Sequence, residues 1–242
     1  MSTPDRIALI TGANKGLGFE IARQLGSQGI HIILGARDAQ RGSEAAAKLK
    51  QEGISAEAVQ LDVAKLGDLA ATRAICDRHG RLDILINNAG IMIEHGKRAS
   101  AVPIDLVRST FETNFFGLVS LTQALLPYVR KSQAGRIVNQ SSMLGSLTIN
   151  ADPNSGIGDY RLLGYNASKA AVNMFTVQLA AELAGTPIKV NAAHPGWVKT
   201  DLGSDAAPME VVDGAKPAVA LALLGADGPT GGFFHMGKPL PW

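Results

Sequence analysis

The sequence predicts an α/β domain with a doubly wound, seven-stranded parallel sheet and helices on both faces. Short apolar runs alternate along the chain with longer amphipathic stretches, which is the pattern of consecutive βαβ units. Right-handed crossovers between parallel strands then favour a doubly wound sheet. The 242 residues suit one α/β domain, and the 46% hydrophobic content suits a large core. Since no linker, repeat or shift in composition divides the chain, we expect a single domain over residues 1–242.

The first half of the chain predicts three strand–helix units. Residues 6–11 (RIALIT) are almost continuously apolar, as in a strand buried on both faces. An apolar repeat at Leu17, Ile21 and Leu25 then indicates a helix over 17–28. By the same two patterns, further strands are predicted at 31–36 and 56–62, and further helices at 38–52 and 66–79.

The second half continues the alternation and contains one irregular segment. Strands are predicted at 82–90, 135–142, 188–195 and 231–236, and helices at 109–131, 165–183 and 215–224. Pro217 is tolerated because it falls in the first turn of its helix. Residues 145–163 are rich in Gly, Asn, Asp and Pro, which predicts a loop insertion there.

Charge and cysteine content exclude several classes of protein. The 23 basic and 21 acidic residues give a net charge of +2, and no basic run is interleaved with aromatic residues, so we expect no nucleic-acid partner. The single cysteine, Cys76, excludes a disulfide scaffold and favours a reducing compartment. No apolar run approaches the ~20 residues of a membrane span. Residues 1–5 lack a secretory pattern. We therefore expect a cytoplasmic protein with no membrane partner.

Small or polar residues follow most of the predicted strands at their carboxyl ends. They are Thr11-Gly12, Ala36-Arg37, Asp62-Val63, Asn87-Asn88-Ala89-Gly90, Ser141-Ser142 and Pro195-Gly196. In a doubly wound sheet, ligands bind at this edge. A chain that needed only a stable core would gain little from such residues, so we expect a small-molecule site there.

The loop TGANKGLG joins the first predicted strand to the first predicted helix. Gly12, Gly16 and Gly18 allow positive φ and a close approach of the backbone to a ligand. The free N–H groups at a helix start bind a diphosphate well. The glycines alone also fit a tight turn with a purely steric role. Together with the polar strand ends, they favour a Rossmann-like dinucleotide site.

The end of the second predicted strand indicates NADP rather than NAD. Sites for NAD place an acidic residue there to accept from the ribose 2′-OH, but this strand ends at Ala36. Arg37 follows and can fork onto a 2′-phosphate, with Arg41 one helical turn further on. Lys15 in the glycine loop can reach the same phosphate. Asp38 weakens this prediction, and the alternative is that the three basic residues are solvated surface charges.

Tyr165 and Lys169 stand four residues apart on a predicted helix and therefore share a face. A phenol with a pKa near 10 is a poor acid or base at neutral pH. A nearby ammonium group favours the phenolate and lowers that pKa, which suits general acid–base work. Ser142 ends the fifth predicted strand and can hydrogen-bond a substrate carbonyl. A lone Tyr–Lys pair is also compatible with a simple contact on a surface helix.

The chain resembles the short-chain dehydrogenases/reductases, a family of Rossmann-fold oxidoreductases. Seven motifs carry the resemblance in order: TGANKGLG, DV at Asp62, NNAG at Asn87, ETNFFG with Asn114, SS at Ser141, YNASK at Tyr165 and HPGWVKT at His194. Within the family, the carbonyl reductases are most similar. The segments NKG, ARDAQRG, NFFG and PGWVKTD and the C-terminal Trp242 carry that finer resemblance.

The resemblance implies reduction of a ketone or aldehyde to an alcohol with NADPH. Tyr165 would protonate the carbonyl oxygen, and Ser142 would orient it. Lys169 would bond to the nicotinamide ribose and lower the pKa of Tyr165. Asn114 would hold a water molecule that relays protons to Lys169. The implied catalytic residues are therefore Asn114, Ser142, Tyr165 and Lys169.

The resemblance also implies a contact set for NADPH/NADP+. Asp62 and Val63 would contact the adenine, Pro195 and Gly196 would frame the nicotinamide with Val198, and Thr200 would bond to its carboxamide side. The full set is Gly12, Asn14, Lys15, Gly16, Leu17, Gly18, Arg37, Arg41, Asp62, Val63, Asn88, Ala89, Gly90, Tyr165, Lys169, Pro195, Gly196, Val198 and Thr200. We expect no metal ligand cluster among the five histidines, and we interpret His194 as a packed or hydrogen-bonding residue.

The interval between Ser142 and Tyr165 departs from the family pattern, because it is longer than in most members. The added residues fall in 145–163, and two interpretations are open: a mobile loop over the substrate pocket, or a surface excursion. In the carbonyl reductases an insertion here covers a surface used for oligomerisation. This one is shorter, so a monomer and a homo-oligomer both stay open.

The substrate is expected to be a neutral carbonyl compound with apolar substituents. The catalytic motifs are flanked by apolar residues, and no convergent arginines favour a carboxylate or phosphate. The flanking residues are Met143, Leu144, Trp197 and Leu202. Two other functions are weighed: an NAD-linked alcohol dehydrogenase working mainly in oxidation, and a non-catalytic NADP-sensing regulator. Arg37 argues against the first, and the complete catalytic set argues against the second.

Overall fold

A computed structural model of the protein describes residues 6–65, 69–158 and 160–242. Its strands form one sheet in the order β3-β2-β1-β4-β5-β6-β7-β8. The strands are β1 (Ile7–Thr11), β2 (His31–Ala36), β3 (Ala56–Gln60), β4 (Ile84–Asn87), β5 (Arg136–Gln140), β6 (Lys189–Ala193), β7 (Phe233–His235) and β8 (Lys238–Pro239). The chain order reverses between β1 and β4, so the doubly wound α/β fold is confirmed.

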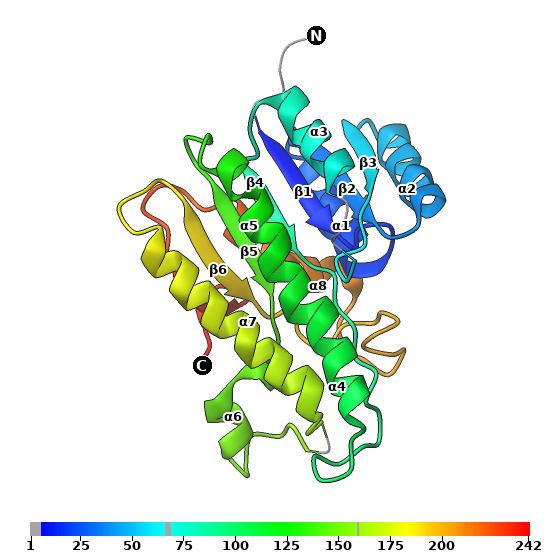
Figure 1. The fold of residues 1–242 in the computed structure, drawn as a ribbon, viewed down its shortest axis with the longest axis vertical. Coiled ribbons are helices and arrows are strands. Elements are labelled where there is room, and N and C mark those ends of the chain that lie inside the picture. The colour runs from blue at the N-terminus through cyan, green and yellow to red at the C-terminus, as the bar shows by residue number, and fades with distance from the viewer. Residues whose placement is uncertain (1–5, 66–68, 159) are drawn as a thin grey trace.

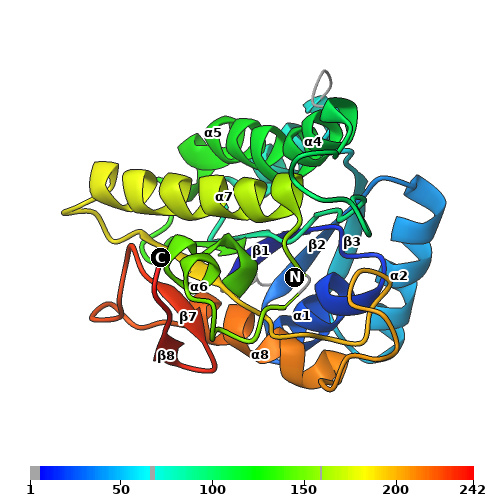
Figure 2. The same cartoon turned by 90° about the horizontal axis from the view of Figure 1, so that it is seen from below.

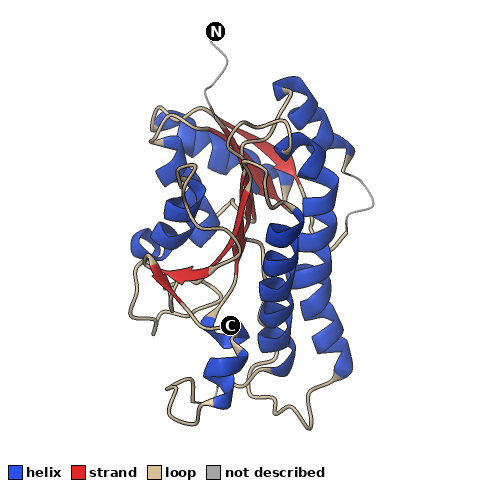
Figure 3. Ribbon diagram, turned by 90° about the vertical axis from the view of Figure 1, so that its left-hand side faces the viewer, coloured by secondary structure: helices blue, strands red, loops and turns tan. Residues whose placement is uncertain are grey.

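Helices cover both faces of the sheet, as Figures 1 and 2 show. They are α1 (Gly16–Gly26), α2 (Ala39–Gln51), α3 (Ala70–His79), α4 (Ile104–Phe111), α5 (Gly117–Val129), α6 (Leu147–Ala151), α7 (Leu163–Glu182) and α8 (Val211–Ala222). One core lies between the sheet and α1, α2 and α8, and a second lies between the sheet and α3, α5 and α7. Viewed from the side, the sheet runs between the two helical layers (Figure 3). In the part of the chain that the structure describes, no helix is long and apolar enough to cross a membrane.

The central strands are apolar throughout because helices bury them from both sides. All five residues of β1 are buried, and Leu9 pairs in parallel register with Ile33 of β2 and Leu85 of β4. The parallel pairing brings the carboxyl ends of β1, β4, β5 and β6 to one edge. That edge faces the lower half of Figure 1, where α6 and the first half of α7 lie.

The sheet has one strand more than the seven predicted. The added strand, β8, pairs antiparallel with β7 through Phe234↔Pro239 and His235↔Lys238. Met236 and Gly237 connect the two strands, and both have positive φ (47° and 77°). This is the backbone of a two-residue hairpin turn with φ > 0 at both positions, for which Asn-Gly is the usual sequence signal. Because methionine occupies the first turn position, the sequence lacks that signal, and the hairpin could not be predicted from it.

Three other predicted elements differ in detail. The helix predicted over 215–224 begins at Val211, so Pro217 lies inside α8 and not in its first turn as predicted. The helix predicted over 109–131 is one helical rod made of α4, a π-helical turn (Glu112–Phe116) and α5. The segment predicted as a loop at 145–163 contains α6, whose first turn is capped because Ser146 Oγ accepts from Ile149 N (3.1 Å). The start of the helix predicted over 66–79 lies outside the described residues.

Gly117, directly after the π turn, is expected to tolerate no side chain. A Cβ there would lie 2.2 Å from the Val63 carbonyl oxygen. Helix propensity favours alanine by about 0.5–1 kcal/mol, but overpacking against backbone costs about 1–3 kcal/mol. Gly117→Ala should therefore lower the melting temperature by a few degrees, at about 2–4 °C per kcal/mol. Gly225→Ala is the matched control, because no heavy atom lies within 4 Å of its Cβ position. Equal melting temperatures for the two variants would contradict this.

Candidate active site

Polar side chains tie the glycine loop to the loop that follows β4. Thr11 Oγ1 accepts hydrogen bonds from the backbone N–H groups of Asn88 (3.0 Å) and Ala89 (2.9 Å). In return, Asn88 Nδ2 donates to the Thr11 carbonyl oxygen (2.9 Å). The expected cofactor residues at the ends of β1 and β4 are therefore brought together at the point where the strand order reverses.

The glycine loop has the backbone that its sequence predicts. Gly12 and Gly16 have positive φ (64° and 55°), which favours glycine. At Gly18, an added Cβ would lie 2.5 Å from the Gly12 carbonyl oxygen and 2.6 Å from Asn88 Nδ2. The helix α1 starts at Gly16, and no side chain caps its first N–H groups. These amides form a cradle of the kind that binds phosphate.

The basic residues of the proposed 2′-phosphate site have different surroundings. Lys15 forms an ion pair with Asp201, in the loop after β6, and both side chains are exposed. Arg41 Nε lies 3.7 Å from Asp38 Oδ2. Asp38 Oδ1 also accepts from Arg41 N (3.0 Å) and so caps α2. Asp38 therefore serves the helix start, and Arg37 stands exposed directly after β2.

The expected adenine contacts lie at the end of β3. Asp62 Oδ1 accepts from Ala64 N (3.1 Å), which holds the turn after the strand. The Val63 carbonyl packs directly on Gly117. Of the remaining residues in the glycine loop, Asn14 is half-buried and Leu17 packs against the core.

The four expected catalytic residues converge beside Gly90. Ser142 forms a side-chain hydrogen bond with Tyr165. Lys169 Nζ lies 5.7 Å from the centre of the Tyr165 ring and donates to the Gln140 carbonyl oxygen (2.8 Å). A Cβ on Gly90 would lie 3.4 Å from Asn114 Oδ1 and 3.5 Å from Lys169 Nζ. The side chains therefore come from β5, α7 and the π turn to a single place.

Asn114 lies in the π turn and its side-chain amide makes three hydrogen bonds. Its Oδ1 accepts from Ile91 N (2.8 Å), and its Nδ2 donates to the Ile91 carbonyl (2.9 Å) and to Ser168 Oγ (3.1 Å). Single π turns inside helices occur frequently at functional sites. Here the turn aims a buried polar side chain at the loop after β4. The predicted role of Asn114 in holding a water molecule stays a prediction.

Burial sets the ionisation of the two central residues. It raises the pKa of Tyr165 to about 12, and the hydrogen bond with Ser142 only partly offsets this rise. Burial also lowers the pKa of Lys169 to about 8. The net pKa of Tyr165 in the protein alone is therefore raised and not lowered as expected, while the contribution of Lys169 to that pKa stays a prediction. Removing a phenolate from water costs more than the nearby hydrogen bond returns.

The segment after β6 lies against the glycine loop. Thr200 Cγ2 is 3.7 Å from the Cβ position of Gly16, at the start of α1. Gly196 has a φ of 94°, and a Cβ there would meet Met209 Sδ at 2.8 Å. Val198 forms a parallel bridge with Met209. The expected nicotinamide residues, from Pro195 onwards, therefore form a second wall of the site.

His194 matches its interpretation as a hydrogen-bonding residue. Its Nδ1 is 3.4 Å from the Gly196 amide nitrogen, which donates to it. Burial, assisted by the neighbouring His235, lowers the pKa of His194 to about 3. The ring is therefore neutral at physiological pH and holds the backbone of the loop after β6 rather than carrying charge.

The insertion contacts the loop after β6 and the last residue of the chain. Tyr160 packs edge-on against Trp197, with ring centres 5.8 Å apart, and Trp197 Nε1 donates to the Gly203 carbonyl (2.5 Å). At the other end of the insertion, Thr148 N donates to the Trp242 carbonyl (3.0 Å). These contacts favour a loop over the pocket and count against a free surface excursion.

Two residues that contact the candidate site are absent from the sequence interpretation. Glu94 is fully buried and accepts from Gly164 N (2.7 Å), one residue before Tyr165. A Cβ on Gly164 would lie 2.1 Å from Glu94 Oε1, so only glycine admits the carboxylate. Gln140 offers Lys169 its backbone carbonyl. A glycine in a first helical turn is a weak signal, and nothing in the sequence connects it to Glu94.

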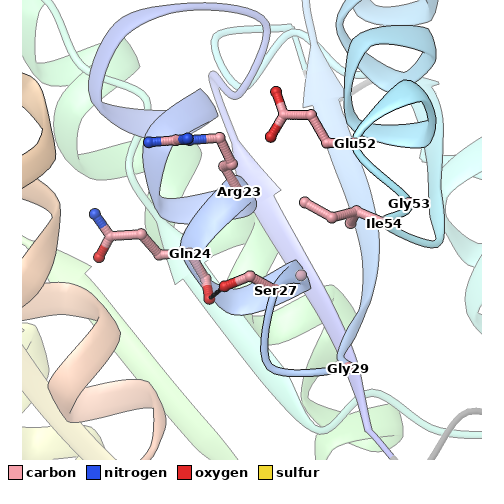
Figure 4. Close-up of a pocket in the computed structure, with 8 residues that line it drawn as sticks. Arg23, Gln24, Ser27, Gly29, Glu52, Gly53 and Ile54 are labelled. Atoms are coloured by element: carbon pink, nitrogen blue, oxygen red, sulfur yellow. Dashed lines mark hydrogen bonds between the residues drawn. The ribbon is translucent and has the colours of Figure 1, made fainter.

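A surface hollow of about 530 Å³ lies away from all of these residues. Arg23, Gln24 and Ser27 of the α1 end and Glu52 of the α2 end line it (Figure 4). It sits at the amino ends of the strands, on the α1 face of the sheet. The candidate active site is therefore identified by the polar side chains that meet near Gly90, and not by this hollow.

Known proteins resemble this chain over most of its length. The short chain dehydrogenase family model matches residues 6–210. Carbonyl reductase (NADPH) 1 of Sus scrofa is 35% identical over 285 residues, covering 100% of this chain and 96% of the relative. The (-)-isopiperitenone reductase of Mentha piperita is 34% identical, with 99% of each chain covered. The crystal structure of an NADPH bound carbonyl reductase from chicken fatty liver superposes with a TM-score of 0.84 at 27% identity, covering 98% of this chain and 99% of that one.

Burial of Lys169 predicts a pH dependence of stability. Its pKa falls from the usual 10.5 to about 8 on folding, so the unfolded chain binds more protons between these pH values. The free energy of unfolding should therefore rise with pH across that window. Lys169→Met removes the group and should remove this rise, while turnover is lost. Denaturant unfolding of both proteins from pH 7 to pH 10 tests this, and parallel profiles would count against it.

Proposed function

This chain belongs to the short-chain dehydrogenase family, and we propose that it reduces a ketone or aldehyde to an alcohol with NADPH. The observation that carries the proposal is the convergence of Ser142, Tyr165 and Lys169 next to the glycine loop. Its full-length relatives with carbonyl reductase in their names support the same reaction. The chemistry therefore follows from the site and from the family together.

The residues present fit a dinucleotide with a 2′-phosphate. The uncapped start of α1 and the close approach at Gly18 suit a diphosphate. No acid occupies Ala36, and Arg37 is exposed beside it with its neighbour Asp38 engaged as a helix cap. Arg37 would therefore fork onto the 2′-phosphate. Lys15 would join it by leaving or sharing its contact with Asp201.

Tyr165 acts as the acid of the proposed reaction. NADPH, when bound, supplies a hydride to the carbonyl carbon. The raised pKa keeps the Tyr165 hydroxyl protonated at neutral pH, so a proton is ready for the carbonyl oxygen. An alkoxide is a stronger base than a phenolate, so this transfer is downhill. Ser142 holds the carbonyl oxygen next to that hydroxyl by a hydrogen bond.

Lys169 stabilises the phenolate that remains. Its ammonium is anchored on the Gln140 carbonyl and lies on the ring side of Tyr165. In a buried site this cation is worth far more than in water. Asn114, whose amide borders the same Gly90, would relay a replacement proton to Lys169 through a water molecule. The protein would thereby return to its starting state after each turnover.

The substrate we propose is neutral and partly apolar. Met143 and Leu144 follow Ser142 directly, and the exposed side chains of Trp197 and Leu202 stand in the loop after β6. Tyr160 packs on Trp197 and would cover a substrate from the insertion. Such a pocket favours a carbonyl flanked by hydrocarbon. Two alternatives are less supported: Arg37 disfavours an NAD-linked alcohol dehydrogenase, and the convergent catalytic groups disfavour a non-catalytic NADP sensor.

Tyr165→Phe should abolish turnover without loss of NADPH binding, because only the acidic hydroxyl is removed. NADPH consumption against ketones, aldehydes, quinones and steroids measures the first effect, and fluorescence titration measures the second. A loss of rate of at least a thousandfold is expected, within reach of acid catalysis worth about 10²–10⁴-fold plus the lost phenol–carbonyl contact. Tyr128→Phe is the control, since Tyr128 bonds with Asp77 far from the site. Rates of wild-type size in Tyr165→Phe would refute the assigned acid.

Arg37→Ala should affect the KM for NADPH and the KM for NADH differently. Loss of a bidentate contact with the 2′-phosphate costs about 1.5–3 kcal/mol, so the KM for NADPH should rise more than tenfold. The KM for NADH should change little, because NADH lacks that phosphate. Steady-state kinetics with both cofactors provide the measurement. Equal effects on the two would argue against a phosphate contact at Arg37.

A further inference from the structure

A second cluster of reactive side chains lies at the opposite end of the sheet. His31 is the first residue of β2, Glu57 belongs to β3, and His79 is the last residue of α3. They meet on the face that α3 covers, at the end of the sheet that is uppermost in Figure 1. The proposed reaction uses none of them. They are far apart in the sequence, which explains why a search for ligand spacing does not reveal them.

The three side chains point their donor atoms at one place. His31 Nε2 lies 3.2 Å and His79 Nε2 lies 2.9 Å from the same carboxylate oxygen, Glu57 Oε1. All three atoms lie within 4.8 Å of one another. In a tetrahedral zinc site with bonds of about 2.0–2.1 Å, neighbouring ligand atoms are roughly 3.3 Å apart. Both nitrogen–oxygen distances are already close to that value, so a small movement of the rings completes the geometry.

Outer contacts orient these groups. His31 Nδ1 lies 2.7 Å from Ser55 Oγ, and Arg78 Nη2 lies 2.5 Å from the second carboxylate oxygen of Glu57. A metal-bound histidine usually donates its other ring N–H to such a partner, which fixes the ring and its tautomer. With Nδ1–H donated to Ser55, the lone pair of His31 is on Nε2. Because Arg78 binds Oε2, the other carboxylate oxygen, Oε1, is the one that faces the two rings.

The three side chains are mostly buried but keep some exposure to solvent, which suits a bound cation. The side chains of His31 and His79 are 12% and 17% exposed, and that of Glu57 is 26% exposed. The site is therefore held by the protein but open on one side. The nearby Cys76 is fully buried, and burial raises the pKa of its thiol to about 11, so it stays out of the ligand set.

We propose that His31, Glu57 and His79 bind one divalent transition-metal ion of the zinc type, with water in the fourth position. Two imidazoles and one carboxylate are a donor set that zinc accepts, whereas calcium and magnesium prefer oxygen alone. The ion takes the place of the protons that otherwise join the two rings to Glu57. It cross-links β2, β3 and α3, and so stabilises the fold at the end remote from Tyr165.

The test is zinc titration of the untagged protein by calorimetry, with cobalt as a spectroscopic probe. We expect one ion per chain and the visible cobalt absorption bands of a four-coordinate site. The melting temperature should rise when zinc is added and fall back to its metal-free value when EDTA removes the zinc. His31→Gln, His79→Gln and Glu57→Gln should each weaken zinc binding at least tenfold. Ser55→Ala should weaken it about 10–100-fold through the lost outer contact.

Two control variants make the test specific. His95→Gln removes an exposed histidine elsewhere, and Cys76→Ala removes the only thiol; both should leave zinc affinity unchanged. Turnover with NADPH should be unchanged in the ligand variants, so folding is verified independently of metal binding. A simple hydrogen-bonded cluster predicts no stoichiometric zinc binding. That outcome, or undiminished binding by the double variant His31→Gln/His79→Gln, would overturn the proposal.

Discussion

The hydrogen bonds that hold α7 against the ends of β4 and β5 determine where the reactive groups lie. Asn87 Nδ2 donates to Asn139 Oδ1 (2.8 Å), and Asn139 Nδ2 donates to Thr176 Oγ1 (2.9 Å) on α7. Two turns nearer the site, Lys169 is fixed on the Gln140 carbonyl (2.8 Å). This ladder of buried polar contacts leaves α7 little freedom to slide or rotate, because any shift would strand several desolvated donors at once. Tyr165 is therefore placed by contacts that extend well beyond the reacting atoms.

The same burial carries a cost in stability that the function requires. A lysine with a pKa near 8 and a tyrosine with a pKa near 12 both show that charge is disfavoured at this place. Low polarity also strengthens any interaction between a phenolate and an ammonium group formed there. The site therefore keeps both side chains close together and buried. The opposing shifts are typical of paired acid–base groups whose environments separate their ionisation.

Periodicity predicted the doubly wound fold class, and strand-end residues predicted the edge of the sheet at which the proposed catalytic groups lie. Both depend on which faces are buried, and apolar spacing encodes burial directly. Contacts between loops are different, because they depend on the path of the chain through space. Three features are contacts of this kind and were not predicted. They are the ion pair of Lys15 with Asp201, the contact of His31 with His79, and the β8 hairpin at Met236. The direction of the Tyr165 pKa shift was missed for a related reason: sequence spacing shows a neighbouring cation but not the depth of burial.

Glu94 shows how such a loop contact completes the site. Its carboxylate reaches the first turn of α7, where free N–H groups and the helix dipole favour negative charge by about 0.3–1 kcal/mol, more when buried. The Gly164 amide donates to it (2.7 Å), and the absence of a Cβ at that position gives it room. Since Gly164 precedes Tyr165, the loop after β4 fixes one end of α7 while Gln140 fixes Lys169 one turn later. The loop after β4 begins with residues proposed to bind the cofactor, and through Glu94 it also positions Tyr165, the proposed proton donor.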